Sequence, residues 1–201
     1  MENSDKKKLM IIEAATKRFA HFGLAKTTMN EIAKDLALSK ALLYYYFPDK
    51  NSLYNEVFLY IIQKMSNEIR LGLEKIDGIE DAMIYFLDQR LLFIQEYYNL
   101  INYSPSKTVQ IPKSLHETYA IAERIEIDLI KTILIRITAK DRRFTEDCEE
   151  MAQIFLYSMI GMRFSVLSKT QKSLFPTREQ FNAILHQQKK VVLLLLRGIM
   201  K

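Results

Sequence analysis

Apolar residues recur every three or four positions along most of the chain, which is the period of amphipathic α-helices. The stripe that runs from Leu9 to Phe22 predicts a first helix over residues 5–22. Gly23 follows it, at the place where a helix end favours a residue that tolerates positive φ. No stretch alternates with period two, so the pattern predicts an all-α chain without a sheet.

Two short helices are predicted next. Thr28 and Glu31 have the spacing of a capping box, in which each side chain bonds the backbone N–H of the other residue, so a helix begins there. A three-residue turn at 36–38 then precedes Ser39. The side chain of Ser39 suits the N-cap of another short helix, which ends before Pro48.

The rest of the chain predicts longer helices separated by Pro, Gly or polar stretches. These helices cover residues 50–74, 79–101 with a kink near Gln95, 114–138, 145–169 and 177–199. Ser114, Thr145 and Thr177 are the expected N-caps of the last three. Together with the N-terminal helices they make about nine helices.

The composition agrees with long helices around a substantial core. Five Gly and four Pro in 201 residues leave few helix breakers, and 49% of the residues are hydrophobic. The lone Cys148 cannot form an internal disulfide, which favours a reducing compartment. The longest apolar run, Val191–Leu196, is far below the roughly 20 residues of a membrane span, and no signal-peptide stretch follows the N-terminus. We therefore expect a cytoplasmic protein that does not enter a membrane.

The sequence carries no enzyme signature. It has no Gly-rich phosphate loop, no HExxH and no CxxC, and His21, His116 and His186 fall on separate predicted elements. The acidic residues between Glu146 and Glu150 suit the positive end of a helix dipole without any catalytic role. We expect no catalysis, no metal and no cofactor.

The net charge of +5 is concentrated in the first quarter of the chain. Residues 6–50 hold nine Lys or Arg and four Asp or Glu, which accounts for the whole excess, while the remainder holds 20 of each sign. This distribution is expected of a polyanion-binding module joined to a neutral body. The alternative is a solvated helix surface with no nucleic-acid partner.

The two short helices and their three-residue turn have the spacing of a helix-turn-helix, which places its second helix in the DNA major groove. On that helix, Leu43 and Phe47 are expected to face the core. The outward residues Lys40, Leu42 and Tyr44 are expected nearest the base edges. The full set of predicted DNA contacts is Lys6, Lys7, Lys8, Thr27, Thr28, Ser39, Lys40, Ala41, Leu42, Tyr44, Tyr45 and Lys50.

A family resemblance rests on residues that follow one another without gaps. They are Ala14-Ala15, Phe19, Gly23, Thr27-Thr28, Ile32-Ala33, Ser39-Lys40, Leu43-Tyr44-Tyr45-Tyr46-Phe47, Lys50 and Leu53. This stretch resembles the N-terminal domain of TetR-family transcriptional regulators and covers about 45 of the 201 residues. The chain departs from the family pattern at Ala37, where Gly is frequent in the turn, and at Leu42, where a small or polar residue is frequent.

The resemblance implies a DNA-binding domain over residues 1–50 and a ligand-binding and dimerisation domain over 51–201. A homodimer would bind a pseudo-palindromic operator in double-stranded DNA, and a small molecule in the second domain would shift the long helix 50–74 and release the DNA. The alternative is a helix-turn-helix repressor without an effector, constitutive or controlled by a partner protein. A third reading is a helical enzyme or lipid carrier with an incidental basic N-terminus.

The C-terminal region is rich in aromatic residues and Met. An ordinary core is the favoured explanation of each residue taken alone, but together they suit a mostly apolar pocket for an apolar or amphipathic effector. The predicted pocket residues are Met65, Phe86, Arg90, Phe93, Tyr97, Tyr119, Met159 and Arg163. Arg163 stands in an otherwise apolar run, where it would anchor an anionic group or pair with an acid across a dimer interface.

The last two long helices are predicted to form the dimer. Residues 191–196 are apolar on every side, and a helix of this kind must be covered on every side. A two-fold partner that presents the same helices would cover the face that the chain leaves open. The predicted contact residues are Phe155, Met159, Ile184, Leu185, Gln188, Val192, Leu195 and Leu196.

Overall fold

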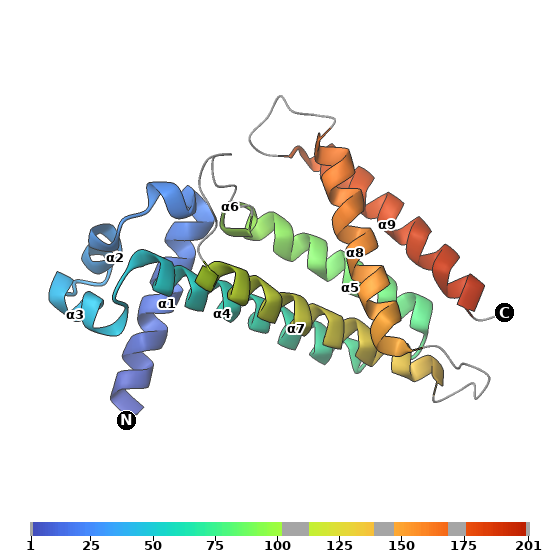
Figure 1. Cartoon of the computed structure of the whole chain (residues 1–201), viewed down its shortest axis with the longest axis horizontal. Coiled ribbons are helices and arrows are strands. Elements are labelled where there is room, and N and C mark those ends of the chain that lie inside the picture. Colours follow the sequence, from blue (N-terminus) through green and yellow to red (C-terminus); the bar gives the residue numbers. More distant parts are fainter. Residues whose placement is uncertain (1, 102–112, 139–146, 169–175, 200–201) are drawn as a thin grey trace. The chain divides into compact units, whose positions relative to one another are not determined.

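The computed structural model describes residues 2–101, 113–138, 147–168 and 176–199, and this part of the chain forms nine α-helices and no strand (Figure 1). The helices are α1 (Glu2–Lys26), α2 (Met29–Asp35), α3 (Lys40–Tyr46), α4 (Lys50–Leu73), α5 (Ile79–Glu96), α6 (Tyr98–Ile101), α7 (Lys113–Thr138), α8 (Cys148–Ser168) and α9 (Arg178–Ile199). The predicted all-α fold class is confirmed.

The first helix differs from its prediction at both ends. α1 begins at Glu2 and reaches Lys26, whereas the apolar stripe predicted residues 5–22. Gly23 has φ 75° and ψ 168°, so the backbone leaves helical geometry there and a short helical segment follows. The positive φ expected of Gly23 is confirmed, but the helix end expected there is wrong because the chain turns into a further helical segment.

The predicted caps and breaks agree with the structure in most places. Thr177 and Gln180 exchange the two hydrogen bonds of a capping box at the start of α9. α5 ends and α6 begins on either side of Tyr97, which confirms the kink predicted near Gln95. The predicted cap Thr145 and the side chain of Ser114 lie outside the described residues.

α8 begins later than predicted. It begins at Cys148 rather than close to residue 145, and the carboxylate of Asp147 accepts the backbone N–H of Glu149 at 2.8 Å. Asp147 is therefore the side chain that caps this helix, in the position that satisfies one of its free N–H groups.

The chain divides into two compact units. The first comprises Met1–Lys64 and Ile94–Ala122, so it holds α1 to α3, the first part of α4, α6 and the first part of α7. Its core is aromatic: Phe19 and Tyr54 meet edge to face at 5.6 Å, and Phe58 meets Tyr119 in the same way at 5.0 Å. The hydroxyl of Tyr54 donates to the carbonyl of Leu100 at 2.5 Å, which fixes α6 against α4.

The second unit comprises Met65–Phe93 and Glu123–Lys201, and in it α8 and α9 pack side by side (Figure 1). A Cβ atom on Gly72 would lie 1.9 Å from the hydroxyl oxygen of Tyr85, so the glycine permits the close approach of α4 and α5. Arg124 and Lys131 on α7 both bind Glu149 on α8. These bonds, from Lys131 first and then Arg124, lower the pKa of Glu149.

The predicted division at residue 50 stays a prediction. α4 contributes residues to both compact units, since Lys64 belongs to the first unit and Met65 to the second.

Candidate nucleic-acid interface

The turn between α2 and α3 has the geometry of a helix C-terminus closed by a left-handed residue. The N–H of Leu38 donates to the carbonyl of Ala33 at 2.9 Å, and the N–H of Ala37 donates to that of Lys34 at 3.1 Å. This is the hydrogen-bond pattern of a Schellman motif, in which the residue at the position of Ala37 has positive φ. Ala37 has φ 51°, so alanine occupies a conformation that favours glycine.

Side chains fix the first turn of both short helices. Thr28 and Glu31 form the predicted capping box: the Thr28 N–H donates to the Glu31 carboxylate at 2.8 Å, and Thr28 Oγ1 accepts the Glu31 N–H. Ser39 Oγ accepts the N–H of Leu42 at 3.2 Å and caps α3. The helix-turn-helix predicted from the spacing is confirmed.

α3 has one buried side and one exposed side. Leu43 and Phe47 are buried in the first unit, as the sequence predicted. Tyr45 is 79% exposed and Tyr44 is 39% exposed. The other outward positions are Lys40 and Ala41, which are exposed, and Leu42, which is half-buried.

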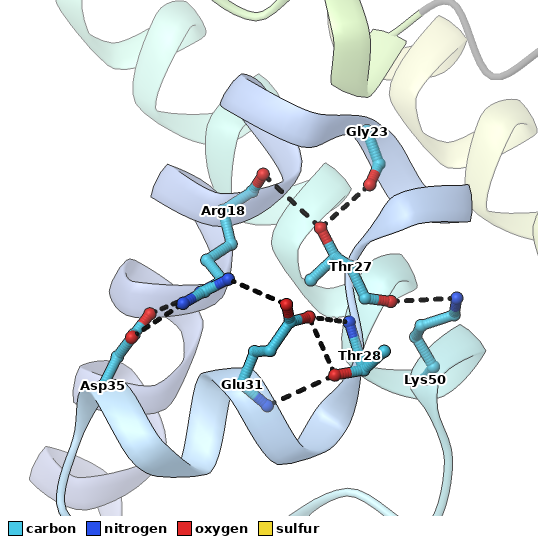
Figure 2. Close-up of polar contacts among 7 residues, drawn as sticks. All are labelled: Arg18, Gly23, Thr27, Thr28, Glu31, Asp35 and Lys50. Atoms are coloured by element: carbon cyan, nitrogen blue, oxygen red, sulfur yellow. Dashed lines mark hydrogen bonds and ion pairs between the residues drawn. The ribbon is translucent and has the colours of Figure 1, made fainter.

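An ion-pair bridge holds α1 against α2 (Figure 2). The guanidinium of Arg18 donates to both carboxylate oxygens of Asp35, at 2.5 and 2.9 Å, and lies 3.5 Å from Glu31. The hydrogen bond from Arg18 lowers the pKa of the Asp35 carboxyl. Hydrogen bonds from the side chain and then the backbone of Thr28 lower the pKa of Glu31. Arg18 on α1 therefore holds α2, the first helix of the helix-turn-helix, in position.

Thr27 and Lys50 lie where α1 passes into the helix-turn-helix (Figure 2). Thr27 is fully buried, and its hydroxyl donates to the carbonyl of Gly23 at 2.9 Å. Lys50 Nζ donates to the carbonyls of Leu24 at 2.8 Å and Thr27 at 3.1 Å. Both side chains thus donate hydrogen bonds to backbone carbonyls at or just after the end of α1. The buried Thr27 side chain does not reach the surface, where the sequence predicted a DNA contact.

The lysines of α1 lie close to its start. Lys6 is exposed, and Lys7 and Lys8 are half-buried. Lys8 pairs with Glu56 at 3.2 Å, and its ammonium lies 5.7 Å from the centre of the Phe47 ring. The DNA contacts of these lysines, like those of α3, stay predictions.

The predicted pocket residues fall into both compact units. Met65, Phe86, Phe93 and Met159 are buried in the second unit, and Arg163 is half-buried there. Tyr97 and Tyr119 belong to the first unit, and Tyr119 packs against Phe58.

Arg90 is 6% exposed and donates to the carboxylate of Glu126. The charge of this predicted pocket residue is thus balanced within the chain.

A groove that the sequence did not predict runs along the first unit. It has a volume of about 620 Å³, and polar side chains of α1 and α4 line it, among them Glu13, Lys17, Tyr60 and Lys64. Only Tyr97 is shared with the predicted pocket. The polar residues of α1 recur at helical spacing there, but no sequence signal pairs them with α4, which lies about 45 residues further along the chain.

The residues predicted for the dimer contact are mostly occupied within the chain. Phe155, Met159, Ile184, Val192 and Leu196 are at most 2% exposed, because α8 and α9 pack on each other and on their own unit. Gln188 is also buried and donates to the carbonyl of Met159 at 2.9 Å, while Leu185 and Leu195 are half-buried. The exposed apolar side chains of this helix pair are instead Ile154, Tyr157, Ile160, Phe164 and Leu194, and the dimer contact itself stays a prediction.

Among the described residues, no helix is long and apolar enough to cross a membrane. The same residues contain no group of three or more His, Cys, Asp or Glu side chains placed to hold a metal ion.

Comparison with known proteins agrees with this geometry. Residues 11–57 match the family described as bacterial regulatory proteins, tetR family, and this stretch includes α2, α3 and most of α1. A transcriptional regulator from Cytophaga hutchinsonii has a crystal structure that aligns with a TM-score of 0.80 at 27% identity, over 97% of this chain and 99% of that one. The N-terminal part of the chain thus matches the TetR family.

The curated relatives match less than half of this chain. It is 39% identical over 70 residues to the regulator YhgD of Bacillus subtilis, covering 35% of this chain and 36% of YhgD. It is 33% identical over 88 residues to IcaR of Staphylococcus aureus, a negative transcriptional regulator of the biofilm operon icaADBC, covering 44% of this chain and 47% of IcaR. The matched stretch spans less than half of the length of either relative.

Proposed function

We propose that this chain is a transcriptional repressor that binds double-stranded operator DNA through α3. The observation that carries the proposal is the exposed side of α3, with Lys40, Tyr44 and Tyr45 outward and Leu43 buried behind them. The basic excess of residues 6–50 supplies the attraction to phosphate. Repression, rather than activation, is supported by the negative regulation that the name of IcaR states.

The proposed repressor is a homodimer. The apolar side chains that α8 and α9 leave exposed support this, since Ile154, Tyr157, Phe164 and Leu194 are each at least 50% exposed. On α8 these residues are spaced by three and seven positions and therefore share one helix face. A two-fold axis through this face would pair two copies of α3 for two operator half-sites, whose centres lie about 34–36 Å apart.

We propose that a small apolar or amphipathic molecule, bound by the second unit, releases the protein from DNA. The buried Phe86, Phe93 and Met159 are the apolar surface that supports this class of ligand. α4 contributes residues to both compact units, so a shift of this helix would reach the DNA-binding part. The effector must bind the DNA-free state more tightly, and DNA must weaken effector binding by the same factor.

The test of DNA binding is a selection from a random duplex library with the full-length protein, followed by footprinting of the enriched sequence. We expect a protected pseudo-palindrome with two half-sites about one helical turn apart. Enrichment of no sequence, at low or at physiological salt, would contradict the proposal.

A thermal-shift screen with apolar and amphipathic compounds distinguishes the inducible repressor from an effector-free one. A ligand that stabilises the protein should also dissociate it from the selected duplex, because the two equilibria are linked. If every compound that stabilises the protein leaves DNA binding unchanged, the effector-free alternative is favoured.

A further inference from the structure

The side chains of α3 offer few ways to hydrogen-bond a base. Its seven residues are one Lys, one Ala, two Leu and three Tyr, so the helix has no Arg, Asn, Gln, Asp or Glu. Arg or Lys bound to guanine, Asn or Gln bound to adenine, and a carboxylate bound to cytosine are the usual hydrogen-bonded contacts in the major groove. Of these, α3 has only the pairing of Lys40 with guanine.

Beside the exposed Lys40, the outward positions at the start of α3 are apolar. Ala41 is exposed, and Leu42, one position further along, is half-buried at the edge of the same face. Because the first turn of a recognition helix is the part that reaches base edges, these two side chains are placed closest to them. Tyr45 lies one turn after Ala41, at the centre of the outward face and 79% exposed.

The polar groups near Ala41 and Leu42 both have a contact within the chain. Ser39 Oγ accepts the N–H of Leu42 at 3.2 Å. The ammonium of Lys40 lies 5.7 Å from the centre of the Tyr44 ring, so the cation is held over an aromatic face. Lys40 thus remains the only charged donor of the helix, beside two aliphatic side chains.

We propose that α3 reads its half-site through the 5-methyl groups of thymine, which Ala41 and Leu42 contact in the major groove. Thymine is the only base that presents a methyl group there, so an aliphatic side chain distinguishes it from the other three. The inference rests on the proposed function, since it requires that α3 enters the groove. It predicts half-sites in which thymine is fixed at one or two positions opposite the first turn of α3.

Deoxyuridine tests this inference directly, because it differs from thymidine only in the missing methyl group and keeps the same base pairing. The experiment uses the full-length wild-type protein and the selected duplex, with each thymine replaced in turn, and fluorescence anisotropy measures the dissociation constant at fixed salt. At a contacted position the loss of one buried methyl group should weaken binding about fourfold. Replacements elsewhere in the duplex should change it less than about twofold.

Two variants assign the effect to a residue. In Leu42→Ala the contacted thymine should lose its sensitivity to deoxyuridine, because the side chain that met the methyl group is gone. In Tyr45→Phe the same fourfold sensitivity should remain, although total affinity falls with the loss of a hydroxyl group. Conversely, a cytosine placed at the contacted position should bind better once it is methylated at C5, since the methyl group is restored.

The outcomes separate this inference from the proposed function. A protein that binds its selected duplex specifically, yet tolerates deoxyuridine at every position, overturns thymine-methyl reading and leaves the repressor proposal standing. Sensitivity that persists unchanged in Leu42→Ala overturns the assignment to Leu42. If no sequence is enriched from the library, both proposals fail.

Discussion

At the scale of single residues, Ala37 is the position where the sequence and the backbone disagree most. A left-handed backbone costs an L-residue with a Cβ atom roughly 1–2 kcal/mol relative to glycine. Ala37 nevertheless has φ 51°, because the two hydrogen bonds of the turn require it. Alanine recovers part of this cost, since it restricts the unfolded chain by about 0.4–1 kcal/mol more than glycine does.

Ala37→Gly should therefore stabilise the protein by about 0.5–1 kcal/mol, as the relieved strain exceeds the entropy gained by the unfolded chain. Urea unfolding followed by circular dichroism measures the difference. Ala41→Gly is the matched control, because Ala41 is also exposed but lies inside α3, where the same change should destabilise by about 1 kcal/mol. Equal destabilisation by both variants would show that Ala37 is not strained.

The sequence predicted features that depend on neighbouring residues, but it did not predict contacts between residues far apart in the chain. The positive φ of Gly23 and the caps Thr28 and Ser39 follow from short-range hydrogen bonding, which a pattern of neighbouring residues reveals. The hydrogen bonds of Lys50 to carbonyls more than twenty residues earlier could not be predicted from neighbouring residues. Neither could the burial of Thr27, since both depend on how α1 and α4 pack.

At the scale of elements, the link between α1 and α2 should make stability depend on pH. The folded pKa values of Asp35 and Glu31 lie below the ordinary values of 3.8 and 4.5. The stabilisation is therefore fully present above those ordinary values, and it is lost as the pH falls through the lower pKa values of the folded state.

Asp35→Asn should be less stable than wild type at about pH 6, and this difference should shrink as the pH falls below the ordinary pKa of 3.8 and wild-type Asp35 becomes protonated as well. Urea midpoints across this range measure it. Arg18→Gln should show the same convergence, because it removes the other partner of the pair. A difference that is constant with pH would exclude the ion pair as its cause.

The contact between α4 and α6 gives a second test at this scale. Tyr54 is 1% exposed, and its hydroxyl donates to the carbonyl of the fully buried Leu100. Tyr54→Phe should destabilise the protein by about 1–3 kcal/mol, because a buried acceptor loses its donor. Tyr45→Phe removes the same atom from a side chain that is 79% exposed and should have no measurable effect on unfolding. Similar losses in both variants would contradict the role given to this hydrogen bond.

For the whole molecule, the proposed dimer contact is the feature that the sequence predicted least well. The apolar run at 191–196 indicated that the last helices need a cover, yet periodicity could not say which face the chain covers by itself. The structure buries Val192 and Leu196 and leaves Leu194 and Phe164 exposed. The fold class and α3 could be predicted from periodicity and spacing. The pocket and the dimer residues could not, because they depend on packing between helices far apart in the sequence.

Phe164→Glu should convert the dimer into a folded monomer, because it places a charge in the exposed apolar face of α8. Light scattering should report about twice the chain mass of 23.7 kDa for wild type and the single mass for the variant. Leu71→Glu is the matched control, since Leu71 is 62% exposed on α4 and this variant should remain dimeric. A dimeric Phe164→Glu, or a monomeric wild type, would place the proposed interface elsewhere.

The proposed binding of operator DNA by the exposed side of α3 is tested by the affinity of two lysine variants for the selected duplex. Lys40 is exposed on α3, and Lys190 is exposed on α9, so each loses one surface charge when changed to alanine. Fluorescence anisotropy on the selected duplex should show that Lys40→Ala raises the dissociation constant at least about fivefold, the lower end of the effect of a base contact. Lys190→Ala should stay within about twofold of wild type. Equal affinities of the two variants would contradict the claim.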